Sequence, residues 1–342
     1  MNLEQMSGDM RRRILYSLFV VGMLSALLAV LLGVGEPAGA SFVSSHGQLS
    51  VANGKIVDEK GKNFVIKGVS THGLAWYPQY VQKKSFASLK KKGVNTIRLA
   101  LYTEEYNGYC NSGSENQENL RNLIDKGVNA ATELGMYVII DWHILSDGNP
   151  LAHKKEAKSF FKAIAKKYKK HNNVLFEICN EPNGDGGSWE NIRNYAKTVI
   201  RTIRSVNKKA IIIVGTPTWC QEIDKAADNP LSGENIVYAF HFYAGTHGQE
   251  LRDRLETALN KKLPVLVSEF GITDASGNGG INKAEGNRWM KLLNRYKVGR
   301  VCWNLSNKGE DSALLKPSCS RVSGWKSSDW SVQAKWLWKQ YS

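Results

Sequence analysis

The segment Phe176-Glu177-Ile178-Cys179-Asn180-Glu181-Pro182 has the pattern of a buried strand that ends abruptly in polar residues. Residues 174–178 are apolar and bulky apart from Glu177. Residues 183–187 (Asn-Gly-Asp-Gly-Gly) favour a loop, because these residue types suit tight turns. The pattern therefore predicts that Asn180 and Glu181 lie at the carboxyl end of a strand, on the rim of a sheet.

A second apolar segment later in the chain ends in the same way. Val265-Leu266-Val267-Ser268-Glu269-Phe270-Gly271 places another carboxylate, Glu269, at the end of a predicted strand. Two carboxylates at two strand ends suit the hydrolysis of a glycosidic bond, in which one group is the acid and the other a nucleophile or base. Glu181 and Glu269 are therefore the candidate catalytic pair.

Around these two segments, strand-like and helix-like patterns alternate eight times from about residue 64 onward. The strand candidates are short runs rich in Val and Ile, as expected for parallel strands covered on both faces. They span 64–69, 94–100, 136–142, 174–180, 210–215, 236–242, 264–270 and 300–305. The helix candidates span 119–134, 153–169, 189–206 (with Ser188 as its cap), 248–261, 282–297 and 329–340, with weaker ones after Val81 and near Ile223.

Eight such repeats predict a fold of the α/β class, a closed (β/α)8 TIM barrel made of residues 41–342 as one catalytic domain. Residues 41–63 have the pattern of a small N-terminal β-hairpin, which we expect at the bottom of the barrel. A doubly wound open sheet would require a glycine-rich nucleotide fingerprint or a switch point, and neither is visible in the sequence.

Residues 1–40 do not fit the barrel pattern. Arg11-Arg12-Arg13 precedes an apolar run over residues 14–34, and Ala38-Gly39-Ala40 has the form of a cleavage site. This predicts a secretory signal peptide cleaved before Ser41. The apolar run is also long enough to span a bilayer, so a membrane anchor remains the alternative. Either way, we expect a secreted protein or one anchored on the outer face of the membrane.

The composition of the 342 residues adds limits on partners. The net charge is +15, but most lysines fall on the polar side of predicted helices and no nucleic-acid motif accompanies them. We therefore expect no nucleic-acid partner. The five cysteines have no metal-binding spacing, and the sequence does not decide whether Cys110 or Cys319 forms a disulfide; the set is Cys110, Cys179, Cys220, Cys302 and Cys319.

In a barrel of this kind the functional face is the carboxyl end of the strands. Polar and aromatic residues accumulate at the predicted strand ends, where a packed core would have none. In chain order they are His72, Trp76, Arg98, Trp142, His143, Asn180, Glu181, Trp219, His241, Tyr243, Glu269 and Trp303.

Six motifs in order resemble glycoside hydrolase family 5, in its bacterial endoglucanase (cellulase) branch. They are Asp-Trp-His at 141–143, Asn-Glu-Pro at 180–182, His-Phe-Tyr-Ala-Gly-Thr-His at 241–247, Ser-Glu-Phe-Gly at 268–271, Asp-Ala-Ser-Gly-Asn-Gly-Gly at 274–280 and Trp-Asn-Leu-Ser-Asn-Lys at 303–308. The resemblance covers about residues 47–341. It implies a retaining endo-β-1,4-glucanase that hydrolyses cellulose and related soluble β-glucans, with no metal or other cofactor.

The resemblance also implies roles for the residues at the strand ends. Glu181 corresponds to the acid/base and Glu269 to the nucleophile. Arg98 and Tyr243 would hydrogen-bond Glu269, and Asn180 would bind the sugar 2-hydroxyl. His143 and His241 would orient the site. We expect the pKa of Glu181 to be raised by the nearby Glu269 charge and by partial desolvation.

Further residues resemble contacts of the sugar chain. Trp303 would stack on the sugar that precedes the cleaved bond. The expected substrate-binding set is His72, Trp76, Ala275, Trp303, Lys308 and Glu310 on that side, with Trp219 and His247 on the leaving-group side. The partner is then a polysaccharide, and we expect a monomer. A mannanase, xylanase or broad β-glucanase remains an alternative, as does a non-catalytic carbohydrate-binding protein.

Overall fold

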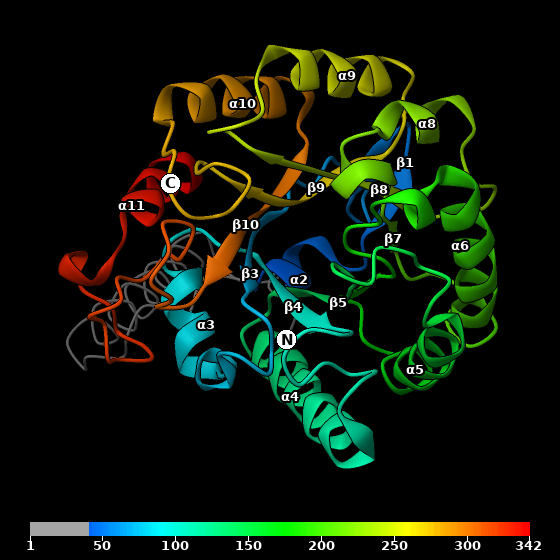
Figure 1. Ribbon diagram of the computed structural model, residues 1–342, viewed down its shortest axis with the longest axis horizontal. Coiled ribbons are helices and arrows are strands. Elements are labelled where there is room, and N and C mark those ends of the chain that lie inside the picture. Colours follow the sequence, from blue (N-terminus) through cyan, green and yellow to red (C-terminus); the bar gives the residue numbers. More distant parts are fainter. Residues whose placement is uncertain (1–40) are drawn as a thin grey trace, which may run out of the picture. The chain divides into compact units, whose positions relative to one another are not determined.

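The computed structural model describes residues 41–342. The predicted signal peptide or membrane anchor lies outside these described residues. Residues 42–342 form one compact unit around a closed barrel of eight parallel strands (Figure 1). Around the barrel the strand order is β10-β3-β4-β5-β6-β7-β8-β9, so each strand pairs with its neighbour in sequence and the last closes on the first. The predicted (β/α)8 TIM barrel is confirmed.

The strands are short and almost entirely buried. They are β3 (Lys67–Thr71), β4 (Thr96–Tyr102), β5 (Tyr137–His143), β6 (Val174–Glu177), β7 (Ile212–Val214), β8 (Ile236–Tyr243), β9 (Val265–Gly271) and β10 (Gly299–Leu305). Because helices cover the outside and side chains fill the inside, both faces of each strand are buried and most of their residues are apolar.

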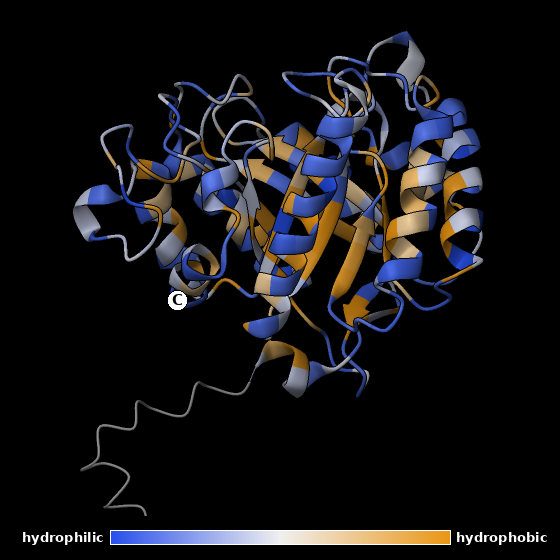
Figure 2. Ribbon diagram, turned by 90° about the horizontal axis from the view of Figure 1, so that it is seen from below, coloured by the Kyte–Doolittle hydropathy of each residue, from blue (hydrophilic) through white to orange (hydrophobic). Residues whose placement is uncertain are grey.

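Helices form the outer ring of the barrel (Figure 1). The main ones are α3 (Lys83–Lys90), α4 (Gly113–Glu133), α5 (Lys154–Lys167), α6 (Trp189–Arg204), α8 (Ile223–Asp228), α9 (Gln249–Asn260), α10 (Lys283–Tyr296) and α11 (Val332–Tyr341). The Ser188 side chain accepts a hydrogen bond from the Asn191 N–H and caps α6, as predicted. Figure 2 shows polar residues on the outer sides of helices and apolar residues along the strands. Apolar burial between the two layers therefore holds the ring to the barrel.

The N-terminal part of the described chain covers the bottom of the barrel. A short helix α2 (Phe42–His46) precedes β1 (Ser50–Ala52) and β2 (Lys55–Val57), which pair antiparallel as the predicted hairpin. Leu49 and Ile56 share one apolar cluster with barrel residues such as Ile213 and Val301. The hairpin thus closes the end of the barrel opposite to the carboxyl ends of the strands.

Element boundaries shift by a few residues from the predicted ones. The first barrel strand begins at Lys67 rather than at residue 64, because Phe64 and Ile66 pack in the apolar cluster at the bottom. Helix α4 begins at Gly113, before the predicted start. Strand β6 ends at Glu177, yet the chain continues along its neighbour because the Asn180 N–H donates to the Trp142 carbonyl.

One rim prediction is wrong. Trp142 was expected at the functional face, but its side chain is buried against Phe160 and Phe161 of α5. Successive residues of a strand point to opposite faces, and Asp141 and His143 occupy the inner face of β5. Trp142 must therefore point outward to the helices, where it is a core residue.

Two general features of the described residues bear on the sequence predictions. All five cysteines are free, so neither Cys110 nor Cys319 forms a disulfide. Within residues 41–342, no helix combines the length and the apolar character needed to cross a bilayer.

Candidate active site

A cleft of about 600 Å³ lies at the carboxyl ends of the barrel strands. It collects nearly all the predicted site residues: His72, Trp76, His143, Glu181, Trp219, His241, Tyr243, His247, Glu269, Ala275, Trp303, Lys308 and Glu310. Arg98 and Asn180 are fully buried and do not line the cleft. They contact the residues that do. Residues far apart in sequence thus meet at one place, because parallel strands bring their carboxyl ends to the same edge.

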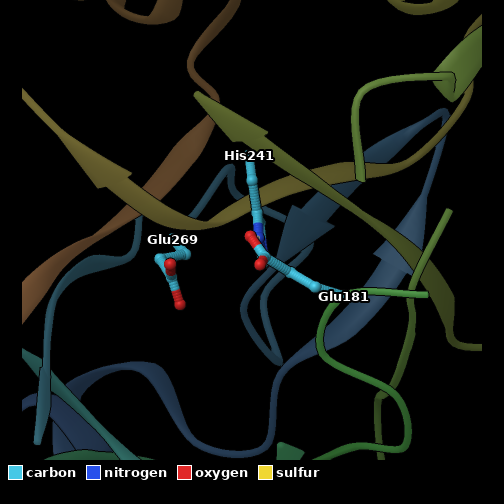
Figure 3. A group of neighbouring side chains, drawn as sticks. All are labelled: Glu181, His241 and Glu269. Carbon is cyan, nitrogen blue, oxygen red and sulfur yellow. The ribbon is translucent and has the colours of Figure 1, made fainter. Parts of the chain in front are cut away.

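Glu181 and Glu269 come together in this cleft. Glu181 follows the end of β6, Glu269 lies on β9, and His241 lies on β8 (Figure 3). One carboxylate oxygen of each glutamate and one ring nitrogen of His241 lie within 4.8 Å of one another. A retaining glycosidase needs its two carboxyl groups about 5–5.5 Å apart, whereas an inverting one needs about 6.5–9.5 Å. The close pair fits the retaining geometry.

Glu181 sits in a protected position and is only 8% exposed. Its Oε1 lies 2.8 Å from Nδ1 of His241. Burial raises the pKa of Glu181 to about 8, and the Arg98 guanidinium opposes this shift. The charges of Asp141 and Glu177 also raise the pKa of Glu181. From the sequence we expected the Glu269 charge to have this effect. A carboxyl group with such a pKa carries a proton at neutral pH.

Glu269 has a different set of partners. The Tyr243 hydroxyl donates to its Oε1 at 2.7 Å, and Nη1 of Arg98 donates to its Oε2 at 3.1 Å. The net shift in the pKa of Glu269 is upward, because burial and the Glu181 carboxyl raise it by more than His241 and Arg98 lower it. Two donors aimed at one carboxylate favour its charged form. The environments of the two glutamates therefore differ as acid and nucleophile require.

Arg98 is the centre of a buried charge network beneath the cleft. Its Nε donates to Oε2 of Glu177 at 2.7 Å, and its Nη2 lies 3.1 Å from Oδ2 of Asp141. The same Nη2 donates to Oδ1 of Asn180 at 2.6 Å. Nδ2 of Asn180 donates to the Ile144 carbonyl at 3.0 Å, which leaves one amide hydrogen for a ligand. Arg98 thus fixes both Asn180 and Glu269 from below.

Glu177 and Asp141 are two members of this network to which the sequence analysis gave no role. Both are fully buried in neighbouring strands. A signal was present, since Glu177 is the one charged residue in an otherwise apolar strand. Acidic residues are rarely buried without a partner, so such a residue predicts a buried cation nearby.

We predict that Glu177→Gln shifts the pH dependence of catalysis. The Glu177 charge raises the pKa of Glu181, so its removal should lower that pKa. The alkaline limb of kcat/KM on soluble cellulose should then move to lower pH, and turnover should fall about tenfold because Arg98 loses a charged partner. Glu190→Gln, on the exposed surface of α6, is the matched control. An alkaline limb that stays in place or moves upward would contradict the prediction.

His241 links Glu181 to the barrel wall. Its Nδ1 faces Glu181 and its Nε2 lies 2.9 Å from the Ser268 hydroxyl. Burial lowers the pKa of His241 to about 4, so the ring is neutral at pH 7. Glu181, His241 and Glu269 are residue types that bind metal ions, but both nitrogens of His241 already have partners. His241 is therefore better suited to fixing the Glu181 carboxyl than to binding a cation.

Four aromatic rings form one wall of the cleft next to the two glutamates. His143 stacks on Trp303 with ring centroids 5.2 Å apart and an interplanar angle of 19°. Tyr102 contacts His143, and His72 contacts Trp303. Burial lowers the pKa of His72 and of His143 to about 3, so both rings are neutral at pH 7. Flat neutral rings suit the apolar face of a sugar. Tyr102 is a cleft residue that the sequence analysis did not identify.

The ends of the cleft carry exposed aromatic and paired charged residues. Trp76 is 41% exposed and packs edge-on against Tyr106, and Trp219 is 44% exposed. Nζ of Lys308 lies 2.7 Å from Oε2 of Glu310, so this pair presents one positive and one negative group to a ligand.

The loops of the cleft place the remaining predicted residues and add new ones. Ala275 lies on an exposed loop, and Nδ1 of His247 accepts a hydrogen bond from the Tyr243 N–H. Cleft residues that the sequence analysis did not identify, besides Tyr102, are Glu105, Leu145, Gln221, Ser276 and Gly277. They follow strands in irregular loops, where sequence patterns give no position.

Comparison with known proteins shows which family the chain is similar to. The family model for cellulase (glycosyl hydrolase family 5) matches residues 57–309, which include all eight barrel strands. Endoglucanase A of Butyrivibrio fibrisolvens is 47% identical over 299 residues, which are 87% of this chain and 69% of that protein. Endoglucanase N of Pectobacterium atrosepticum is 44% identical over 333 residues, covering 97% of this chain and 73% of that protein. The catalytic domain of Thermobifida fusca endoglucanase Cel5A has a TM-score of 0.82 at 33% identity, covering 87% of this chain and 98% of that one.

Proposed function

The chain belongs to glycosyl hydrolase family 5, and we propose that its retaining endo-β-1,4-glucanase activity is carried out by Glu269 as nucleophile and Glu181 as acid/base. The observation that carries the proposal is the approach of the two carboxylates to within 4.8 Å at the carboxyl ends of the strands. That separation leaves space for a sugar carbon and its leaving oxygen but none for an interposed water.

In the first step, Glu269 attacks the anomeric carbon while the proton of Glu181 moves to the glycosidic oxygen. The bond from the anomeric carbon to that oxygen breaks, and a covalent glycosyl-enzyme forms. Arg98 and Tyr243 hold the attacking carboxylate in place. The amide of Asn180 is positioned by Arg98 to meet the sugar 2-hydroxyl, a contact that strengthens as positive charge develops on the ring.

In the second step, the same groups act in reverse. Glu181, now ionised, takes a proton from water, and the water oxygen attacks the anomeric carbon. The bond to Glu269 breaks, and the configuration at the anomeric carbon is retained. His241 holds the Glu181 carboxyl at 2.8 Å in both steps, so one side chain serves as acid and then as base.

We predict a bell-shaped pH dependence of kcat/KM. The first step requires Glu269 ionised and Glu181 protonated, so activity should fall at low pH as Glu269 is protonated and at high pH as Glu181 loses its proton. With the pKa of Glu181 at about 8, the alkaline limb should lie near pH 8. Initial rates on a soluble cello-oligosaccharide from pH 4 to pH 10 measure both limbs. An alkaline limb below pH 6 would contradict this assignment of the acid.

The substrate range can be tested directly. Reducing-sugar release should be greatest on carboxymethylcellulose and on lichenan, and much smaller on mannan and xylan. Proton NMR of the first products of cellopentaose hydrolysis should give the β-anomer. An α-anomer as first product would exclude the double displacement. Hydrolysis of mannan or xylan in preference to the glucans would exclude the glucanase assignment.

The site of action is also part of this proposal. A polymeric glucan has to be cut outside the cytoplasm, and the pattern of residues 11–40 is that of an export signal or anchor. N-terminal sequencing of the exported protein should give Ser41 if the signal is cleaved. We also expect a monomer, which sedimentation can test.

A further inference from the structure

The loop that carries Trp219 has an unusual backbone. Thr218, Trp219 and Cys220 have φ angles of 56°, 53° and 61°, three consecutive residues in the left-handed region. Residues other than glycine avoid this region, and a run of them persists only where surrounding contacts hold it. The middle residue of the run is the exposed tryptophan of the cleft. The strained turn thus presents one specific side chain.

Two contacts connect this turn to the segment that carries the acid/base. The Trp219 N–H donates to the Pro182 carbonyl at 3.0 Å. The thiol of Cys220 donates to the Asn180 carbonyl at 2.9 Å. Since Asn180 and Pro182 flank Glu181, the turn is fixed to both sides of the group that protonates the leaving oxygen. The backbone of Trp219 is therefore fixed next to the Glu181 segment, and its side chain lines the same cleft as Glu181.

The Cys220 side chain also links the end of the turn to its start. It is fully buried and accepts a hydrogen bond from the Thr216 N–H at 3.4 Å. Burial raises the pKa of the thiol well above its ordinary value, so the group stays protonated and keeps its donor. One side chain thus joins the start of the turn, its end, and the segment that carries the acid/base.

We propose that Cys220 is a positioning residue that holds Trp219 in place as the platform for the leaving side of the glucan chain. The proposal rests on the proposed function. Cys220 itself does not touch the substrate. It acts through the orientation of Trp219, so its removal should affect those substrates whose leaving group is a sugar.

The test compares two substrates that share the glycone side. Cleavage of cellopentaose releases a sugar leaving group that would stack on Trp219. The leaving group of 2,4-dinitrophenyl β-cellobioside is a phenolate, which requires neither Trp219 nor a general acid. Cys220→Ala should lower kcat/KM on cellopentaose about tenfold, mainly through KM, and less than about twofold on the aryl cellobioside. Cys220→Ser, which keeps a donor and an acceptor, should restore most of the loss. If the alanine variant fails to fold, Cys220→Val removes the same hydrogen bonds while filling the space.

A double-mutant cycle and a matched cysteine complete the design. In a Trp219→Ala background, Cys220→Ala should cause little further loss, because the platform is already absent. Cys319→Ala is the control, since Cys319 is also buried and free but its thiol donates to the Arg321 carbonyl, outside the segment of the acid/base. Equal losses on both substrates, additive losses in the cycle, or an unchanged Cys220→Ala variant would each overturn the proposal. If the wild-type chain hydrolyses neither substrate, the proposed function fails instead.

Discussion

Glu269→Ala is expected to abolish glucan hydrolysis while leaving the barrel folded. The variant lacks the carboxylate that we propose as the nucleophile, so we expect a loss of at least about 10⁴-fold in kcat on carboxymethylcellulose. Arg98 keeps Glu177 and Asp141 as charged partners, so no bare cation is left in the core. Reducing-sugar release measures the loss, and thermal unfolding tests the fold. Glu250→Ala, at a side chain that is 94% exposed on α9, is the control.

A small external nucleophile sharpens this prediction. Removal of the Glu269 carboxyl leaves space on the face of the sugar from which it attacks. Azide in that space should attack the anomeric carbon of 2,4-dinitrophenyl β-cellobioside, displace the phenolate and leave an α-linked glycosyl azide. The configuration is then inverted, because one displacement replaces two. Near-normal hydrolysis by the variant, or rescue that yields a β-linked azide, would contradict the nucleophile assignment.

The sequence predicted the barrel because its strands are buried on both faces. Continuous apolar runs such as 174–176 and 265–267 have no polar side to place in water, which favours a sheet covered by helices. The carboxyl-end rule then located Glu181 and Glu269 without knowledge of distances. Strand boundaries were less certain. Phe64 and Ile66 have the apolar character of strand residues, but they are buried in the apolar cluster at the bottom of the barrel, before the strand begins.

The side of the strand to which a side chain points was harder to predict than the position of its residue along the strand. Trp142 and His143 are neighbours in sequence, yet one faces the helices and the other the cleft. The alternation of side chains decides this only once the inner face of β5 is known. The partners of Arg98 were also hidden, since Glu177 and Asp141 meet it only after three strands are in register. The role of Cys220 depends on backbone angles, which a sequence pattern does not give.

Glu181→Gln should separate the two chemical steps. Hydrolysis of carboxymethylcellulose should fall by about 10²–10⁴-fold, the usual effect of losing a general acid. Dinitrophenolate needs no proton to leave, so the first step on 2,4-dinitrophenyl β-cellobioside should remain fast. The second step loses its base, and a burst of phenolate followed by slow turnover should appear. Mass spectrometry should then find the trapped sugar on Glu269. Slow release without a burst would contradict the acid/base assignment.

The same variant should gain stability relative to the wild-type chain as the pH rises. Burial raises the pKa of Glu181 to about 8, against about 4.3 for a glutamate in an unfolded chain, so the folded state holds this proton more tightly. The stability that the protonated carboxyl contributes is full below about pH 4.3 and is lost as the pH rises through 8. Glutamine does not ionise, so the variant does not lose stability in this way as the pH rises. The difference in melting temperature, variant minus wild type, should therefore grow between pH 4 and pH 8. A difference that stays constant or shrinks would mean that the folded chain does not hold the proton on which the first chemical step depends.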